Sequence, residues 1–382
     1  MVTSSPFPFS SPEDRPNRRG FLKAAAAVAT AGLGLAGPTS ARGIGPFVHT
    51  DDKAGTRPPI LGEGAHRFEV THGWGHLPDS IRWGETHGVT IDPEGFIYIT
   101  HRSTEAAPMD AIVVFDPQGR FVRSFGREFH GGGHGIDLRI ESGQSFLYLC
   151  DMTRGQVVKS DLKGEVVWRK AAPPECPMYD RPEAKFVPTN VAFDPDGGFL
   201  VADGYGSNLI HRYDAQGCHR GWFGGTGTEP GRFRTPHGLW VDQRPGRVAV
   251  GGEDGPVLVV ADRANARLQW FTLEGKWLAV GNNLVSFPAH FDIDPLNDLM
   301  VIPDLHARVT LMDRSNQVVT HLGDDPEWTK TVLDGFRVRR QPETWRPGRF
   351  VHPHDACFDH DGNLVVVEWV ATGRVNFLRK LA

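Results

Sequence analysis

Histidine recurs at one point of a repeated segment, and imidazole is a side chain that commonly binds metals and transfers protons in proteins. The segment opens a short apolar run six times, at intervals of 47 to 64 residues. Five copies carry histidine at the shared position and the third carries asparagine. In chain order these residues are His87, His134, Asn190, His237, His290 and His354. If the copies are arranged around an axis, the imidazoles form a ring, which is the arrangement that a metal site needs.

The elements that must position this ring are short strands. In the clearest copy, strand-like runs at 88–91, 96–100, 111–115 and 120–126 are separated by Asp-Pro-x-Gly turns or a longer loop. The chain has 45 Gly and 29 Pro and no sustained helical repeat. These features predict an all-β fold, a six-bladed β-propeller of four-stranded antiparallel blades. The last copy holds only about three strands, so we expect residues 66–71 to supply the fourth and close the ring between the chain ends.

The first residues are typical of an export signal. Arg18 and Arg19 form a twin-arginine signature, followed by the apolar run 24–36, which is too short to span a bilayer. Small residues at 39–41 suit a cleavage point. We therefore predict a signal peptide over 1–41, a linker over 42–63 and the propeller over 64–382. The twin-arginine translocase would be a partner, the location periplasmic or extracellular, and no membrane anchor is expected.

The net charge and the cysteines argue against two classes of function, nucleic-acid binding and a thiolate metal site. The formal net charge is −5 and no basic stripe is present, which argues against nucleic acid as a partner. The four cysteines permit disulfides in an oxidising compartment, but the pairing stays open. None has Cys-x-x-Cys spacing, so a thiolate metal site is not expected. The charged, Trp-containing stretch 324–349 is interpreted as an excursion over one face, either a lid or a surface loop.

Alternate blades of a six-bladed ring stand about 120° apart, so three of them can supply three ligands and leave one position open. His134, His237 and His354 form one such set. His87, Asn190 and His290 form the other set. Asp355, directly after His354, is a candidate oxygen ligand for a second, harder cation. The alternative is that the histidines only make structural hydrogen bonds.

A second recurrent position lies at the end of each second strand, where most copies carry a carboxylate. Its members are Asp151, Asp203, Asp262, Asp304 and Glu368, with His101-Arg102 in the first copy. Several have arginine a few residues later, and an Asp–Arg pair bracing neighbouring blades explains most of them. Arg102, Tyr205 and Arg263 depart from that pattern and are candidate functional residues.

These residues together resemble a known family. The segments Ala202-Asp203-Gly204-Tyr205, Pro236-His237-Gly238-Leu239, Ala261-Asp262-Arg263-Ala264-Asn265 and Pro353-His354-Asp355 are typical of NHL repeats. More narrowly, residues 84–380 resemble the lyase that cleaves peptidyl-α-hydroxyglycine to a peptide amide and glyoxylate. The order of these segments and their blade placement make the resemblance moderately specific.

The resemblance implies a zinc ion held by His134, His237 and His354. It implies a catalytic tyrosine at Tyr205 and active-site arginines at Arg102 and Arg263. It also implies a structural calcium, bound by the Asp355 carboxylate and the carbonyls of Val89 and Ile136. This chain departs from the family in the absence of its disulfides, since Val187, Gly206 and Val259 lie where cysteines would be expected. His87 and His290 are additional imidazoles, and the stretch 206–208 is altered.

Three functions stay open at this point. The first is a metal-dependent lyase acting on a small-molecule or peptide C-terminal substrate. The second is another metal-dependent hydrolase, for a lactone or ester, on the same scaffold. The third is a non-catalytic propeller that binds peptide or carbohydrate in the cell envelope. Tyr205 separates the first two, because a lyase needs it as a proton acceptor and a metal-hydroxide hydrolase does not.

Overall fold

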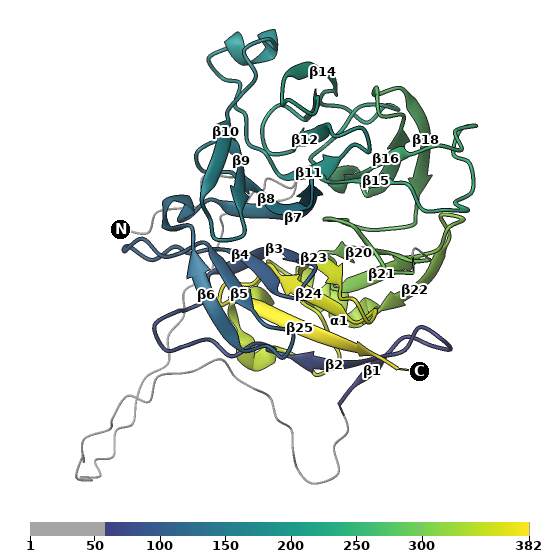
Figure 1. Cartoon of the computed structure of the whole chain (residues 1–382). Helices are drawn as coiled ribbons and strands as arrows, with labels where there is room; N and C mark the ends of the chain where they lie inside the picture. The colour runs from purple at the N-terminus through teal and green to yellow at the C-terminus, as the bar shows by residue number, and fades with distance from the viewer. Residues whose placement is uncertain (1–57, 297, 382) are drawn as a thin grey trace, which may run out of the picture. The chain divides into compact units, whose positions relative to one another are not determined.

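Six antiparallel sheets, five of four strands and one of five, are arranged in a ring in the computed structural model, which describes residues 58–381 except 297 (Figure 1). The first three blades are β3 (Glu85–Ile91), β4 (Ile97–Arg102), β5 (Ile112–Phe115), β6 (Phe121–Phe125); β7 (Gly133–Glu141), β8 (Gln144–Asp151), β9 (Gln156–Asp161), β10 (Val166–Lys170); and β11 (Asn190–Phe193), β12 (Phe199–Asp203), β13 (Leu209–Tyr213), β14 (His219–Gly224). The next two are β15 (Pro236–Asp242), β16 (Val257–Asp262), β17 (Arg267–Phe271), β18 (Trp277–Asn282); and β19 (Asp292–Ile293), β20 (Met300–Asp304), β21 (Arg308–Met312), β22 (Val318–Leu322). The sixth blade contains β23 (Pro353–Phe358), β24 (Leu364–Glu368) and β25 (Arg374–Lys380). The predicted six-bladed β-propeller is confirmed.

The ring closes between the two ends of the described chain. Strand β2 (Phe68–His72) pairs antiparallel with β25 and supplies the fourth strand of the sixth blade. The short strand β1 (Ile60–Leu61) then adds a fifth strand, although it falls in the range expected to be a linker. Closure pairs the backbone groups of an edge that would otherwise face solvent.

The hydrophobic core is divided among the six junctions between neighbouring blades. Each junction holds its own apolar cluster, such as the one that places Val259 of β16 against Ile302 of β20. The alternation of side chains along the strands accounts for this division, because each blade faces a neighbour on both sides. Burial of each such side chain contributes about 1.5–3 kcal/mol.

The expected turns explain why strands reverse where they do. Asp92 Oδ1 accepts hydrogen bonds from the amides of Glu94 and Phe96, and Asp116 Oδ1 accepts from the amides of Gln118 and Arg120. Each turn ends on a glycine with positive φ, Gly95 at 87° and Gly119 at 79°. Glycine adopts this conformation without a Cβ clash, so the turn sequence determines the local geometry.

The excursion at 324–349 is folded against the propeller. It contains α1 (Pro326–Leu333), capped by the Asp325 carboxylate, and two short 3-10 helices, η4 (Val338–Arg340) and η5 (Pro342–Thr344). Trp328, Val332 and Val338 are buried in one cluster with Val351 and Val370. The remaining 3-10 helices are η1 (Arg127–Phe129), η2 (Pro177–Asp180) and η3 (Arg263–Asn265).

Two further predictions concern the chain outside the blades. The signal peptide at 1–41 lies outside the described residues. Among those that the structure describes, no helix has the length and apolar character needed to cross a membrane. All four cysteines are free thiols, and Cys150, Cys176 and Cys357 are buried.

Candidate metal centre

The ring histidines lie at irregularities in the innermost strands. The pairing of the first two strands shifts register at the histidine position in blades 1, 2, 4 and 6, for example between Gly133 and Ile136 and between Pro353 and Asp355. A bulge at this point turns the side chain out of the normal alternation. Four blades therefore direct an imidazole toward the same region of the central channel.

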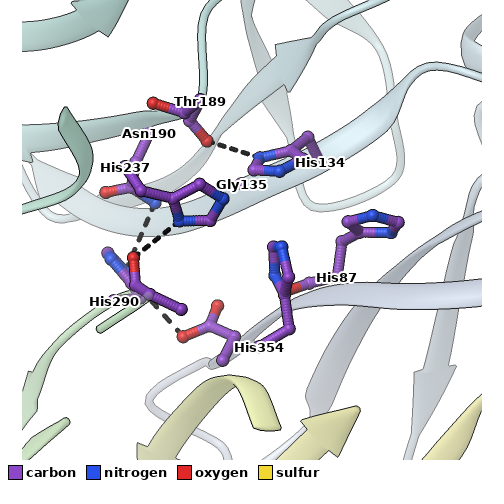
Figure 2. A pocket seen from close by; sticks show the side chains of 10 residues that line it. His87, His134, Gly135, Thr189, Asn190, His237, His290 and His354 are labelled. Atoms are coloured by element: carbon purple, nitrogen blue, oxygen red, sulfur yellow. Dashed lines mark hydrogen bonds and ion pairs between the residues drawn. The ribbon is translucent and has the colours of Figure 1, made fainter. Parts of the chain in front are cut away.

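Four imidazoles gather there (Figure 2). The ring of His354 lies 4.6 Å from that of His87, 4.7 Å from that of His237 and 4.9 Å from that of His134, between centroids. His134 is also 5.0 Å from His87 and 4.9 Å from His237. The cavity lined by these side chains measures about 10 Å³, enough for one ion or water.

We call His134, His237 and His354 the even-blade histidines, and they share one contact. The Nδ1 atom of each faces a backbone carbonyl of the next blade: Thr189 O at 2.8 Å, Ala289 O at 2.7 Å and His87 O at 2.8 Å. A carbonyl only accepts, so Nδ1 carries the proton and Nε2 keeps its lone pair. In metal sites, a hydrogen bond from the ring nitrogen that does not bind the metal orients a histidine ligand in this way.

Burial keeps these imidazoles neutral. It lowers the pKa of His134 to about 3, with the nearby Arg263 and Arg102 charges acting in the same direction. Burial also places the pKa values of His237, His354 and His87 well below the usual range. The Nε2 atom of His134 is buried and has no hydrogen-bond partner in the described structure. Neutral imidazoles with an orphaned nitrogen are what a metal ion requires, so the residues fit a metal.

The third histidine ligand of a metal could be either His87 or His237. The ligand atoms of His87, His134 and His354 lie within 4.8 Å of one another and form the closest triad. His237 instead has its Nε2 3.0 Å from the Tyr205 hydroxyl. His87 Nδ1 also faces a carbonyl, Glu85 O of its own strand at 2.9 Å, whereas the even-blade histidines face carbonyls of the next blade. His134 and His354 belong to both sets.

We call His87, Asn190 and His290 the odd-blade set. His87 is neutral like the even-blade histidines, and His290 is the member with a different environment. His290 Nε2 lies 3.3 Å from Asp137 Oδ1, 4.0 Å from Asp355 Oδ1 and 3.4 Å from Asn190 Nδ2. Burial lowers the pKa of His290, but the Asp355 and Asp137 carboxylates outweigh it and raise that pKa to about 9. The two carboxyl groups thus favour the charged form of His290, while burial raises the pKa of Asp355 itself to about 8.

This pairing bears on the calcium expected at Asp355. The Asp355 oxygens accept hydrogen bonds from the amides of Val89 and Ala356, and Oδ1 also faces His290. Calcium takes six to eight oxygen ligands. The contacts of Asp355 are thus with N–H groups, and calcium at Asp355, Val89 and Ile136 stays a prediction.

Tyr205 lies at the rim of the imidazole cluster. Its hydroxyl is 3.0 Å from His237 Nε2 and accepts a hydrogen bond from Arg263 Nη1 at 3.0 Å. The Arg263 guanidinium is buried and also lies 5.1 Å from the centroids of the Tyr205 and Phe287 rings. The structure therefore brings two of the three candidate catalytic residues into direct contact beside the histidines.

Arg102 makes its closest contact with a carboxylate of its own blade. Its Nη2 forms an ion pair with Glu85 Oε2 at 2.5 Å. Glu85 Oε1 also pairs with Arg339 of η4, and Oε2 accepts from the Trp369 indole at 3.2 Å. Burial raises the Glu85 pKa, but the Arg102 and Arg339 charges outweigh it, so the net direction is downward. Glu85, Arg339 and Trp369 were missed from the sequence.

The comparison with known proteins agrees with this fold. No family model matches the chain. A probable peptidyl-alpha-hydroxyglycine alpha-amidating lyase from Caenorhabditis elegans is 27% identical over 210 residues, which cover 50% of this chain and 56% of that protein. The peptidyl-glycine alpha-amidating monooxygenase of Mus musculus is 24% identical over 253 residues, 56% of this chain and 24% of that protein. NHL repeat-containing protein 3 of the same organism is 26% identical over 224 residues, 56% of this chain and 60% of that protein.

The aligned region spans less than two thirds of each of these relatives. Among solved structures, virginiamycin B lyase from Staphylococcus aureus superimposes with a TM-score of 0.50 at 11% identity, covering 82% of this chain and all of that one. That likeness shows the fold alone. The chain is a six-bladed NHL-like β-propeller that resembles peptidyl-α-hydroxyglycine α-amidating lyases.

Proposed function

We propose that this chain is a zinc-dependent lyase that cleaves the C–N bond of an α-hydroxyglycine-type substrate, either a small molecule or a peptide end. The observation that carries the proposal is the contact of the Tyr205 hydroxyl with both Arg263 and His237. A group able to accept a proton thus lies against the imidazole cluster. The distant similarity to amidating lyases supports the same reaction class.

His134, His237 and His354 would hold the zinc through Nε2, with His87 beside them. Bound zinc would act as a Lewis acid that lowers the pKa of the substrate hydroxyl. When His237 Nε2 is a ligand it no longer accepts from Tyr205, which leaves the phenol oxygen available to the substrate. That the bound metal is zinc is part of this proposal.

Tyr205 is the proposed proton acceptor for the substrate hydroxyl. The Arg263 guanidinium favours negative charge on Oη through its own charge and its N–H bond. Once the hydroxyl proton leaves, the C–O electrons form the carbonyl of glyoxylate and the C–N electrons leave with the nitrogen. That nitrogen takes the proton that Tyr205 accepted and becomes the amide, so the atoms balance and Tyr205 returns to its starting state.

The substrate carboxylate needs a positive partner. Arg102 and Arg339 share the single carboxylate of Glu85, which leaves an excess positive charge at the rim. Arg102 also contributes to lowering the His87 and His134 pKa values, so its charge is felt at the imidazole cluster. We propose that Arg102 and Arg263 orient the carboxylate and that Glu85 and Arg339 hold Arg102 in place.

The same proposal includes export by the twin-arginine route to the periplasm or the exterior, which depends on residues 1–41. The alternatives are a lactone or ester hydrolase and a binding propeller. A hydrolase would not need the contact between Tyr205 and Arg263. A binding propeller would not need neutral imidazoles with an orphaned nitrogen.

The test is glyoxylate release from N-benzoyl-α-hydroxyglycine by the zinc-loaded protein. Tyr205→Phe should lower kcat by about 10²–10⁴-fold, the range for loss of a general base. Its zinc content should be unchanged, and Tyr213→Phe, a tyrosine elsewhere in the same blade, should keep wild-type turnover. Full turnover in Tyr205→Phe would favour a hydrolase-type mechanism, and no turnover by zinc-loaded wild type would overturn the lyase.

A further inference from the structure

Blade 3 differs from its neighbours in how it neutralises a buried carboxylate. Three second strands end on a carboxylate directly opposite an arginine of the third strand: Asp262–Arg267, Asp304–Arg308 and Glu368–Arg374. These pairs lie 2.6, 3.3 and 3.2 Å apart. In blade 3 the carboxylate is Asp203, and the residue opposite is Leu209. The blade that carries Tyr205 therefore lacks the arginine at this position.

A chain of titratable side chains takes its place. Tyr179 of η2 donates its hydroxyl proton to Asp203 Oδ2 at 2.8 Å and lies 2.7 Å from His211 Nε2. His211 Nδ1 is 3.2 Å from His219 Nε2, and His219 Nδ1 is 3.7 Å from Glu175 Oε2. His211 and Asp203 are fully buried, whereas the Glu175 side chain is 61% exposed. Hydrogen bonds thus link His219 to the carboxylate, and the exposed Glu175 lies within ion-pair distance of His219 at the solvent end.

The donors and acceptors fix a direction. The Tyr179 hydroxyl has one proton, which it gives to Asp203, so His211 must donate from Nε2 and keep Nδ1 as an acceptor. His219 must then donate from Nε2. If a proton arrives at His219 Nδ1, the Nε2 proton of His219 moves to His211 Nδ1, the Nε2 proton of His211 moves to the Tyr179 oxygen, and the Tyr179 proton moves to Asp203. Each hydrogen bond of the array is then kept with its donor and acceptor exchanged. Both histidines have changed tautomer.

Asp203 also holds the turn on which Tyr205 lies. Its Oδ1 accepts from the Val187 amide at 2.6 Å and its Oδ2 accepts from the Ser207 amide at 2.5 Å. The Tyr205 amide in turn donates to Val187 O at 3.3 Å. Hydrogen bonds to a charged carboxylate are about twice as strong as those to a neutral group. The charge of Asp203 therefore determines how firmly the turn is held.

We infer that Glu175, His219, His211 and Tyr179 form a proton relay that carries solvent protons to Asp203, and that these are positioning residues for the Tyr205 turn. The consequence for turnover rests on the proposed function, but the relay itself does not. The environment of the carboxylate agrees: burial raises the pKa of Asp203 to about 7, against the amide and Tyr179 hydrogen bonds that lower it. Burial also lowers the pKa of His211 to about 3, which keeps this imidazole neutral. The other titratable side chains that face the array are Cys176, Asp180 and Tyr213.

The direct test is the tautomer of His211, read by long-range ¹H–¹⁵N NMR of the full chain labelled with ¹⁵N-histidine. His211→Gln identifies the signal. The relay predicts a proton on Nε2 at pH 8.5 and on Nδ1 at pH 5.5. His101 is the matched control, because its Nδ1 accepts from the Gly84 amide and its Nε2 faces Asp110 O, so it should keep one tautomer. An unchanged His211 tautomer across this range would overturn the relay.

A substitution can introduce the pattern of blades 4, 5 and 6. Leu209→Arg places an arginine opposite Asp203, which should keep the carboxylate charged and hold His211 with its proton on Nε2 at both pH values. Tyr179→Phe serves if that variant does not fold, since it cuts the relay and should leave His211 in one tautomer. A tautomer exchange that persists in both variants would contradict the role of Asp203 as proton acceptor.

The effect on the turn is measured by hydrogen exchange of peptides covering 203–208. After correction for intrinsic rates, exchange should be about tenfold faster at pH 5.5 than at pH 8.5. The blade 4 counterpart is the control: Asp262 accepts from the Arg234 amide at 2.8 Å and is paired with Arg267, so this amide should show no such change. Equal behaviour of the two turns would overturn the positioning role. Because no measurement here needs turnover, failure of the lyase assay leaves the relay to be judged by itself.

Discussion

The even-blade histidines and the odd-blade set occupy the same position of the repeat, yet their environments differ. His134, His237 and His354 each donate Nδ1–H to a carbonyl of the next blade and stay neutral. His290 faces Asp137 and Asp355, which favour its charged form, while Asn190 contacts it. The repeat therefore places the side chains, but the residues of the neighbouring blades determine their charge. His87 is neutral like the even-blade histidines and lies beside them, so within the odd-blade set His290 alone faces carboxylates.

The largest expected effect breaks the even-blade half. His134→Ala should lower zinc affinity by more than about 100-fold, because loss of a ligand exceeds the effect of losing a ligand's hydrogen-bond partner. The measurement is a competition titration with a chelating dye. Asn190→Ala, at the same repeat position in blade 3, is the control and should bind zinc as wild type does. Equal affinities in the two variants would remove the distinction between the halves.

The next effect tests the charge of the odd-blade half. His290→Gln should lower the free energy of unfolding by about 3 kcal/mol, because Asp137 and Asp355 are left buried without a cation. Urea unfolding at neutral pH measures this. A loss well below 1 kcal/mol would mean that His290 is neutral.

The pH dependence of the free energy of unfolding tests the effect of burial on a neutral imidazole outside the ring, that of His101. Burial lowers the pKa of His101 to about 4 from the unfolded value of 6.5. The unfolded chain thus binds the proton more tightly than the folded chain does. The contribution of the neutral imidazole to the free energy of unfolding is therefore complete above pH 6.5 and is lost as the pH falls through 4. The size is on the order of 3 kcal/mol.

His101→Gln keeps an acceptor for Gly84 and a donor for Asp110, and it should remove that part of the acid sensitivity. Urea unfolding at pH 7 and pH 4 compares the variant with wild type. The exposed His360→Gln should leave the difference between the two pH values unchanged. A wild-type slope in His101→Gln would show that its neutral state does not contribute.

The smallest effect restores the missing member of the ring. Asn190→His should destabilise the protein by about 1 kcal/mol, because a larger side chain must fit against Gly135 and beside the His290 imidazolium. Zinc affinity should not change. Thermal unfolding with and without zinc measures both, and a gain in zinc affinity would show that the odd-blade position also supplies a ligand.

The fold was predictable because its signals are local and repeated. Asp92 and Asp116 lie in turns that determine their own geometry, and the alternation between them marks each strand. Ring closure followed from counting, since the last copy lacked one strand and 66–71 could supply it. That ring histidines gather at the axis was predictable from their shared repeat position, and the alternate-blade choice of ligands stays a prediction.

The remainder of the site depends on contacts between residues far apart in sequence. Glu85 pairs with Arg339 across 254 residues, and a carboxylate two residues before His87 gives no sign of that partner. The approach of His87 to His134 and His354 depends on the bulge in β3 rather than on the ring geometry. The array of Tyr179, His211 and His219 was also missed, because its members lie in a 3-10 helix and two separate strands.

The most direct measurement is elemental analysis of the purified full chain, comparing wild type with His237→Ala and His87→Ala. We predict about one zinc per chain in wild type and in His87→Ala, and its loss in His237→Ala. Zinc lost from His87→Ala but retained in His237→Ala would assign the third ligand to the closest triad instead. Absence of a transition metal from wild type would contradict the metal centre itself.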